Sequence, residues 1–539
     1  MEKRIFIAVV ISIAFLGLWS VVIPKLFPEL VKKPAPVAAK PMVAKTTGAT
    51  TAATKAATPS VAPPAMHAAA PVSGTTLKQS VVDMPEFTAV FSNRGAELVS
   101  FKLKHYTTSD KQPVELVKGR DAGRTDFPFS ITTKGQNPFN SALYAVNERD
   151  DHGVRVIDYR YSDGHTTVTK TFRVGPEFQF DFAVNVVPPT PYRVEIGPGI
   201  RTLAPDEIDS RFVVTGNGIA QTEGKLKVVG REKGDRVNVY DDIQFTGIED
   251  NYFLTVLKPA KGGQAVIHRA EFKDGKEIRK ELYAGVNAAS DGTVSGQAFF
   301  GPKQTKILEA YGLDSTLQFG FFSFIARVLL DVLIWINKTT RNYGLAIIAL
   351  TVLIKIVLYP LQHKSIVSMK KMQKVQPKVE AIKNRYKKSR TDAEQRQKMN
   401  TEMMKLYQQE GINPMGGCLP MVLQLPILWA FYGLLSRAIE LRGAPFYGWI
   451  HDLSAKDPYY ITPILMTITM FFQQQLTPTT GDPAQRRMFL IMPLVFGWIF
   501  KEFPSGLVLY WLVQNILTIA QQLIMNKYWK DHPAELKTA

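Results

Sequence analysis

A single lysine inside a long apolar run is the residue best placed to carry a function. Lys355 interrupts residues 344–360, which otherwise carry no charge and are long enough to cross a membrane. A charge at the bilayer centre costs ~3 kcal/mol or more, so such residues usually face the protein interior or a water-filled cavity. Because the run holds no Asp or Glu to pair with it, Lys355 predicts a hydrated, positively charged groove open to the cytoplasm. The alternative is that its long stem reaches the lipid headgroups.

Further polar side chains share the helical face of this lysine. Four residues lie on one side of the predicted helix, because they are spaced by four, four and three positions: Thr351, Lys355, Tyr359 and Gln362. A polar stripe on a membrane helix points away from lipid. Other apolar segments carry uncharged polar residues, which either line one shared cavity or each bond a neighbouring helix: Gln424, Thr462, Thr469, Gln473, Gln514 and Thr518.

The sequence lacks the residues that several other membrane-protein functions require. An intramembrane protease needs histidine in the membrane, and a proton-coupled transporter needs buried carboxylates. The predicted spans hold no histidine, and Glu440 and Glu502 lie near span ends. A Gly-x-x-x-x-Gly-Lys-Ser/Thr motif is absent, and the histidines of the middle region lack metal-ligand spacing. We therefore predict that the protein is not an enzyme and uses no cofactor and no metal.

The charge distribution favours a membrane over nucleic acid. The net charge is +18, and residues 362–418 hold 13 Lys and Arg against 5 Asp and Glu. The positive-inside rule places that segment in the cytoplasm and accounts for much of the excess, so we predict no DNA binding. The single cysteine, Cys418, excludes an intramolecular disulfide.

The elements before residue 316 predict an anchored domain outside the membrane. Residues 1–28 contain an apolar stretch after two basic residues, which predicts an uncleaved transmembrane anchor. Residues 29–80 are rich in Ala, Pro and Thr and predict a flexible tether. Residues 81–315 alternate between apolar and polar in short runs separated by turns, which predicts an all-β sandwich; the clearest runs are 86–91, 96–103, 154–161 and 178–186.

Topology decides the role of residues 316–340. Their large apolar residues would suit a span, but Arg327 and Asp331 interrupt them. A chain with a cytoplasmic N-terminus reaches a cytoplasmic segment 362–418 after two crossings, whereas three crossings would place that segment outside. Residues 316–340 should therefore form an amphipathic helix at the outer interface. The predicted spans are 5–23, 343–361, 419–436, 458–475, 488–503 and 504–525.

The predicted fold class is a multi-domain membrane protein with six transmembrane α-helices, a periplasmic β-sandwich and a cytoplasmic helical hairpin. The five-helix core covers residues 341–530, and a short C-terminal tail covers 531–539. Within the hairpin 362–418, residues 391–394 fit a capping box that opens its second helix. Its methionines either bind variable apolar partners or pack the two helices together. Its basic face suits anionic lipid or ribosomal RNA.

The chain resembles the YidC family of membrane protein insertases over nearly its whole length. The most specific segments are Asn-Pro-Met-Gly-Gly-Cys-Leu-Pro at 413–420, Trp-Ile-His-Asp-Leu-Ser at 449–454, Asp-Pro-Tyr-Tyr at 457–460, and Phe-Pro-Ser-Gly-Leu-Val-Leu-Tyr-Trp at 503–511. The large domain between anchor and core is similar to the Gram-negative form. The resemblance implies an inner-membrane protein with both termini in the cytoplasm and residues 29–340 in the periplasm.

The resemblance also implies a site. Family members have a hydrophilic groove whose single charge is usually arginine, and Lys355 occupies that position here, with Thr351 at another groove position. Lysine keeps the charge but loses the bidentate fork of arginine. Trp511 stands where many relatives have tyrosine. The implied partners are nascent membrane proteins, the Sec translocon, membrane lipids, the ribosome and the signal recognition particle pathway.

The mechanism we expect is insertion of hydrophobic segments without an external energy source. The groove shortens the desolvation barrier for a polar tail, and Lys355 attracts acidic residues in that tail. The segment then slides out against apolar residues of two spans, namely Leu423, Met492 and Phe496. The alternative function is a membrane chaperone that depends entirely on the translocon and has no insertase activity of its own.

Overall fold

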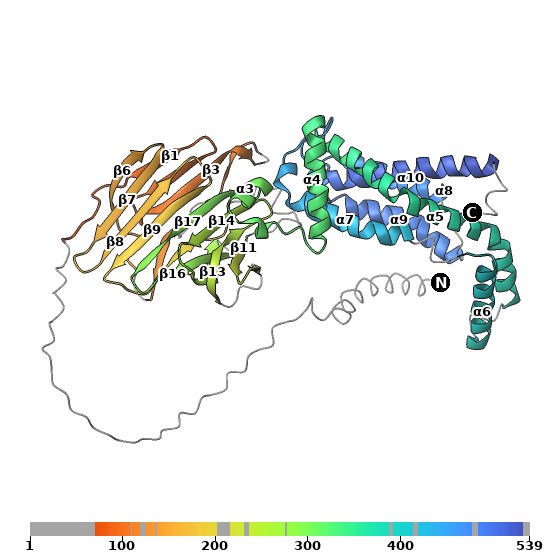
Figure 1. Cartoon of the computed structure of the whole chain (residues 1–539), viewed down its shortest axis with the longest axis horizontal. Helices are drawn as coiled ribbons and strands as arrows, with labels where there is room; N and C mark the ends of the chain where they lie inside the picture. Colours follow the sequence, from red (N-terminus) through yellow and green to blue (C-terminus); the bar gives the residue numbers. More distant parts are fainter. Residues whose placement is uncertain are drawn as a thin grey trace, which may run out of the picture. The chain divides into compact units, whose positions relative to one another are not determined.

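The computed structural model describes residues 70–108, 110–118, 126–134, 137–201, 216–230, 237–274, 277–386, 392–412, 419–476 and 483–531. The chain divides into two compact units, Met1–Met66 and His67–Ala539, and all described residues lie in the second (Figure 1). The predicted anchor 1–28, the tether up to residue 69 and the tail from residue 532 lie outside the described residues.

The region before the helices is a large β-sheet domain, as the alternating sequence predicts. One sheet has four strands in the order β1-β2-β3-β4, and the other has thirteen, with the main order β5-β10-β16-β15-β13-β14-β17-β9-β8-β7-β6 and β11 and β12 attached through β13. The strands are β1 (Gln79–Asp83), β2 (Phe87–Ser92), β3 (Glu97–Thr107), β4 (Pro113–Glu115), β5 (Ser130–Thr133), β6 (Ala145–Asp151), β7 (Val154–Ser162), β8 (Thr167–Val174), β9 (Gln179–Val187), β10 (Tyr192–Ile196), β11 (Asn217–Thr222), β12 (Lys225–Val229), β13 (Asn238–Glu249), β14 (Phe253–Pro259), β15 (Gly263–Asp274), β16 (Glu277–Asn287) and β17 (Thr293–Pro302).

The individual strand predictions are confirmed. The turn at 92–95 joins β2 to β3, and Gly95 adopts a φ of +72°, a left-handed conformation that favours glycine. The runs at 154–161 and 178–186 form β7 and β9. Residues before 81 also contribute to the β domain, because Val72 forms an antiparallel bridge with Ser162. Two short helices that the sequence did not predict follow β17, α3 (Thr305–Ala310) and η3 (Asp314–Thr316).

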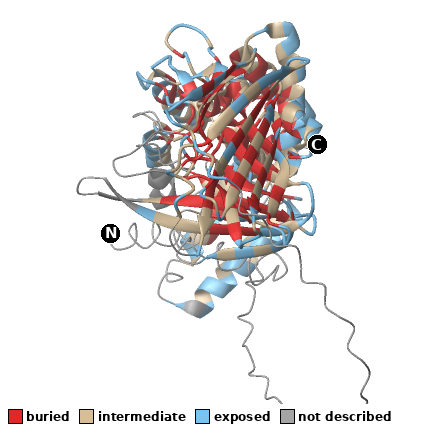
Figure 2. Cartoon of the chain, turned by 90° about the vertical axis from the view of Figure 1, so that its left-hand side faces the viewer, coloured by how far each residue is buried: buried red, intermediate tan, exposed pale blue. Residues whose placement is uncertain are grey.

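Aromatic side chains join the two sheets. Phe91 of the four-stranded sheet lies 4.7 Å, between ring centroids, from Phe172 of the larger sheet. Phe101 pairs in the same way with Phe300 at 5.5 Å. Figure 2 shows buried positions alternating with less buried ones along the strands, as expected where one face of a sheet packs on a core.

A lysine lies wholly buried in this core. The Lys170 ammonium on β8 donates hydrogen bonds to the carbonyl oxygens of Gly95 at 2.6 Å and Phe129 at 2.7 Å. Desolvation lowers its pKa from 10.5 to about 8, and attraction by Glu97 opposes that shift. The lysine therefore gives the β domain a stability that depends on pH.

We expect the β domain to become more stable as the pH rises from 8 to about 10. In that window the unfolded lysine holds its proton and the native one does not, so unfolding takes up a proton and becomes less favourable. At ~1.4 kcal/mol per pKa unit the gain reaches roughly 3 kcal/mol. The unfolding midpoint of the β domain in the whole protein in detergent, followed by loss of the β-sheet circular dichroism signal, measures it. Lys170→Met should lack this rise, and an equal rise in both proteins would contradict the assignment.

Helices form the rest of the described chain. They are α4 (Ser323–Thr340), α5 (Tyr343–Arg385), α6 (Ala393–Gln409), α7 (Leu419–Arg437), η6 (Ile439–Leu441), α8 (Ile461–Leu476), α9 (Pro483–Phe500) and α10 (Ser505–Asp531). Among the described residues, two helices are long and apolar enough to cross a membrane, Tyr343–Arg385 and Ser505–Tyr528, and Leu490–Phe500 is a shorter apolar helix. The predicted segments 419–436 and 458–475 correspond to α7 and most of α8.

The helix that contains the predicted span 343–361 continues beyond it, since α5 runs as one helix of 43 residues through Pro360 and Pro377 into the hairpin. One local prediction for the hairpin needs correction. The second hairpin helix is capped by Asp392, whose carboxylate accepts from the backbone N–H groups of Glu394 and Gln395, and not by the threonine that the capping-box pattern suggested. A carboxylate at a helix N-terminus also gains from the helix dipole, which explains why aspartate takes this role.

Close packing between helices depends on glycines. A Cβ atom added at Gly433 of α7 would lie 2.1 Å from the backbone oxygen of Phe319. At Gly497 of α9 the added atom would lie 2.0 Å from Thr467 Oγ1 on α8. Both distances are far inside van der Waals contact, so these glycines set how closely their neighbours approach.

Gly433→Ala is expected to lower the stability of the core by about 1–3 kcal/mol, because backbone must move to admit the methyl group. The thermal unfolding midpoint of the protein in detergent reports the loss. Gly175→Ala is the matched control, since the nearest atom to its added Cβ is a Val154 methyl at 3.9 Å. Equal midpoints for the two variants would show that the contact at Phe319 is not tight.

Candidate functional site

The structure places Lys355 inside the helical region and gives it a partner. The residue is 8% exposed, and its Nζ donates to Thr518 Oγ1 on α10 at 2.9 Å. The Thr518 hydroxyl in turn donates to the Gln514 carbonyl at 2.7 Å, so it accepts the hydrogen bond from the lysine through a lone pair. Thr518 was noted in the sequence as one of several polar residues, but nothing there identified it as the partner of Lys355.

α5 and α10 run side by side in the same direction (Figure 1). Ile347 lies beside Gly506, Lys355 contacts Thr518, and Met525 shares a small apolar cluster with residues 366 and 367. From one contact to the next, the residue numbers increase in both helices, so the two helices are parallel. Since both helices rise equally per residue, their polar residues face one another in register. We call this set the polar seam: Thr351, Lys355 and Gln362 of α5 with Gln514, Thr518 and Gln521 of α10.

The polar seam is buried, and only some of its polar atoms have hydrogen-bond partners. Thr351 is fully buried, and its hydroxyl donates to the carbonyl of Ile347 at 2.6 Å. By contrast, the side-chain oxygens of Gln362, Gln514 and Gln521, and the nitrogen of Gln521, are buried and find no partner among the residues that the structure describes. Unsatisfied buried amides mark a place where water or a guest molecule supplies hydrogen bonds.

Gln424 contacts α10 at a different point from the seam. Its amide donates to the hydroxyl of Tyr510, which is fully buried and stacks on Phe431 with ring centroids 4.3 Å apart. Tyr510 was not among the predicted site residues. Its position next to Trp511 within the specific segment 503–511 was the available signal.

The remaining predicted residues lie in three different settings. Trp511 packs against α9, with its ring 6.2 Å from Phe496 and 5.4 Å from Phe500. Met492 is half-buried on the same helix. Tyr359 is 48% exposed, and its ring lies 5.9 Å from that of His363. Leu423 lies in α7, and its side chain is outside the described residues.

The seam can recognise charge and hydrogen-bonding groups. Thr518 is the one hydrogen-bond partner of Lys355 within the described residues, which leaves the ammonium two further donors. No group of three or more His, Cys, Asp or Glu suited to a metal occurs in the described part of the chain. A lone cation among amides and hydroxyls suits binding of an anionic or polar guest rather than proton transfer.

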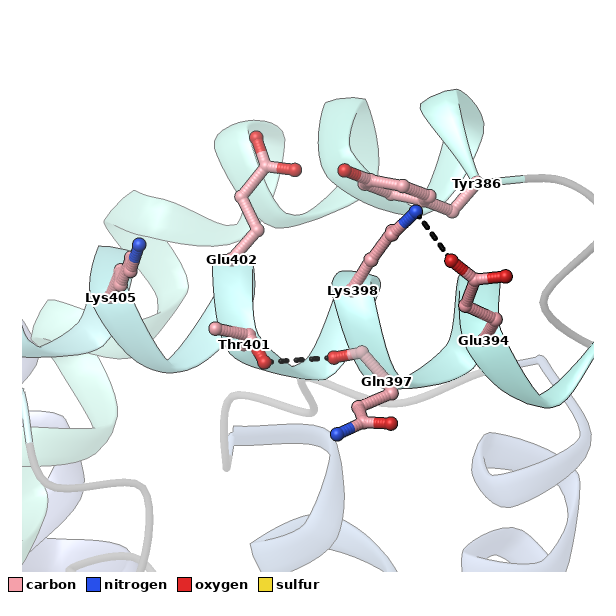
Figure 3. Close-up of a pocket in the computed structure, with 7 residues that line it drawn as sticks. All are labelled: Tyr386, Glu394, Gln397, Lys398, Thr401, Glu402 and Lys405. Carbon is pink, nitrogen blue, oxygen red and sulfur yellow. Dashed lines mark hydrogen bonds and ion pairs between the residues drawn. The ribbon is translucent and has the colours of Figure 1, made fainter.

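A hollow in the hairpin formed by the end of α5 and α6 is separate from this site. Figure 3 shows it between the end of α5 and one side of α6, where Lys398 forms an ion pair with Glu394 at 2.8 Å. Exposed ion pairs of this kind contribute little binding energy. Deeper in the hairpin, Met372 packs with residues of both helices, and Met403 lies against the same cluster. These two methionines therefore hold the hairpin together.

The fold and the seam define a membrane protein with a large β-sheet domain and a helical core. The family described as YidC periplasmic domain matches residues 79–332, and the family described as 60Kd inner membrane protein matches residues 335–532. Together the two matches cover most of the chain.

Relatives of similar length match throughout. The membrane protein insertase YidC of Geotalea uraniireducens is 36% identical over 98% of this chain and 99% of its own, and that of Citrifermentans bemidjiense is 37% identical over 98% and 100%. A solved structure described as an active YidC insertase with its first transmembrane domain resolved is 20% identical, with a TM-score of 0.36 over 84% of this chain and 94% of that one. The chain belongs to the YidC family of membrane protein insertases.

Proposed function

We propose that this chain inserts hydrophobic segments of newly made proteins into the inner membrane through a polar groove formed at the seam. The observation that carries the proposal is Lys355, the one buried cation among the described residues of the helical region, whose only described partner is a hydroxyl. Membership of the insertase family supports the same activity. The family is defined by insertion and not by a chemical reaction, which agrees with a site that offers recognition groups alone.

The seam lowers the main barrier to insertion. A short polar tail crosses a bilayer poorly because its groups must leave water. Amides and hydroxyls partway across replace some of those lost hydrogen bonds, and the Lys355 ammonium attracts acidic residues of the tail. The following hydrophobic segment moves into lipid past Leu423, Met492 and Phe496, driven by removal of apolar surface from water.

The proposed topology has six spans, with both termini in the cytoplasm and residues 29–340 in the periplasm. α4 then lies at the outer interface. Its exposed face supports this position, since large apolar side chains point outward from the helix or the turn just before it: Phe321, Phe324, Val328 and Trp335. Arg327 and Asp331 are exposed between them, which fits headgroups better than acyl chains.

The proposed partners are nascent membrane proteins and membrane lipids, with the Sec translocon docking on the external face. The ribosome and the signal recognition particle pathway are further partners that would meet the basic cytoplasmic hairpin. The second candidate function is that of a chaperone that acts only with the translocon. The two differ in a single respect, since only the first predicts insertion into membranes that lack a translocon.

Thiol labelling tests whether the seam is an open groove. Single cysteines are placed at Thr351 and Thr518 in a chain in which Cys418 is replaced by serine. We expect a membrane-impermeant maleimide added from the cytoplasmic side to label both, because water reaches the seam. A cysteine at Ile347, buried and apolar on the same helix, is the matched control and should stay unlabelled. Protection of all three positions would contradict a groove open to the cytoplasm.

A further inference from the structure

Three glutamines of the seam carry hydrogen-bonding groups that its own residues do not use. Gln362, Gln514 and Gln521 are 8%, 9% and 8% exposed, yet their side-chain oxygens have no partner among the described residues. The Gln521 amide nitrogen is unpaired in the same sense. Polar atoms at this depth are normally satisfied, so a guest that brings both donors and acceptors gains by binding here.

The spacing of these glutamines suits an extended chain. Gln514 lies one turn before Thr518, and Gln521 lies three residues after it, so the two amides flank the lysine contact along α10. Their separation corresponds to a rise of roughly 10 Å, about the length of three residues of extended polypeptide. Gln362 adds a third amide from the facing helix, two turns beyond Lys355.

We propose that Gln362, Gln514 and Gln521 form a subsite for the polypeptide backbone of the segment being inserted. The inference rests on the proposed insertase function and adds to it a recognition element that does not depend on sequence. A carboxamide offers an acceptor and two donors, which match the N–H and C=O of any peptide group. Lys355 then selects for charge, whereas the glutamines bind what all substrates share.

A double-mutant cycle between protein and substrate tests this subsite. The full chain is reconstituted in liposomes, and the substrates are two synthetic single-span peptides with neutral tails, one with plain alanines and one with N-methylalanine at one tail position. N-methylation removes one backbone donor. We expect it to slow insertion by the unaltered protein about fivefold, the usual effect of one lost hydrogen bond. In Gln521→Leu the plain peptide should be slowed by a similar factor, and methylation should add little further.

Two further variants make the result decisive. Gln362→Leu removes an amide from the other helix and should show the same coupling for some methylated position, even if Gln521→Leu folds poorly. Gln474→Leu is the matched control, since its buried side-chain oxygen is also unpaired in the described chain but lies on α8, outside the seam. Here the effect of methylation should persist in full.

The outcomes separate the subsite from the function on which it rests. Suppose that the unaltered protein inserts both peptides but that methylation slows insertion by the same factor in Gln521→Leu as in the unaltered protein. The glutamines then do not bind the backbone, and the subsite is wrong while the proposed function stands. Coupling in Gln474→Leu as strong as in Gln521→Leu would overturn the subsite as well. If the unaltered protein inserts neither peptide above empty liposomes, the proposed function falls first.

Discussion

Lys355→Glu is expected to slow the insertion of a protein with an acidic tail at least tenfold while sparing one with a basic tail. The change replaces attraction by repulsion at a site where two unit charges 4 Å apart interact by roughly 4 kcal/mol at an effective dielectric constant of 20. A tenfold change requires only ~1.4 kcal/mol of this. The measurement is the rate at which the tails of paired substrates, identical except for tail charge, become protected from protease.

Lys355→Arg is the matched control for this prediction. It preserves the positive charge and still reaches a hydroxyl acceptor, so acidic tails should insert at close to the original rate. Lys355→Leu removes the charge without reversing it and should give an intermediate rate. If Lys355→Glu inserted acidic tails normally, the electrostatic step would be wrong and the groove would act through its neutral groups alone.

Asp250→Ala is expected to destabilise the β domain by about 3–5 kcal/mol, the usual cost of stranding one partner of a buried ion pair. Asp250 and Arg201 are paired with side chains 1% exposed each, and the guanidinium also lies over the ring of Phe253. The second carboxylate oxygen of Asp250 accepts from the backbone N–H groups of Tyr252 at 2.8 Å and Phe253 at 2.7 Å. The variant therefore loses the two hydrogen bonds to the backbone of the turn as well as the ion pair.

The thermal midpoint of the β domain, followed by loss of the β-sheet circular dichroism signal of the whole protein in detergent, should fall by about 10 °C. Arg149→Ala provides the comparison. It breaks the ion pair between Arg149 and Asp158, in which the two side chains are 50% and 34% exposed. Exposed pairs of this kind contribute about 0–1 kcal/mol to the free energy of unfolding. Similar shifts for the two variants would mean that the buried pair is not the anchor of this turn.

Much of the fold could be predicted from local patterns. Alternation of apolar and polar residues identified β7 and β9, and the turn at 92–95 identified the β2–β3 hairpin, because these signals lie within a few residues of one another. The polar stripe through Thr351 and Lys355 also has a local cause, the helical repeat. Both residues are buried in the structure, and their role in substrate binding remains a prediction.

Features that depend on distant residues were not predictable in this way. The contact between Lys355 and Thr518 joins positions 163 residues apart, and no pattern in one sequence selects this threonine over the others in the core. The bond between Gln424 and Tyr510 is also long-range, since it joins positions 86 residues apart. The continuation of α5 through Pro360 and Pro377 was not predicted either, and beyond Pro360 this helix packs on α10 through a cluster of residues 366 and 367 with Met525.

Reconstitution into liposomes that contain only this protein tests the central claim most directly. A single-span protein with a short acidic tail is added, and the fraction whose tail reaches the lumen is scored by protection from protease. We predict protection well above that of empty liposomes, and its loss with Lys355→Glu in liposomes holding equal amounts of folded, correctly oriented protein. Protection no higher than in empty liposomes would contradict autonomous insertion and would favour a chaperone that works only with the translocon.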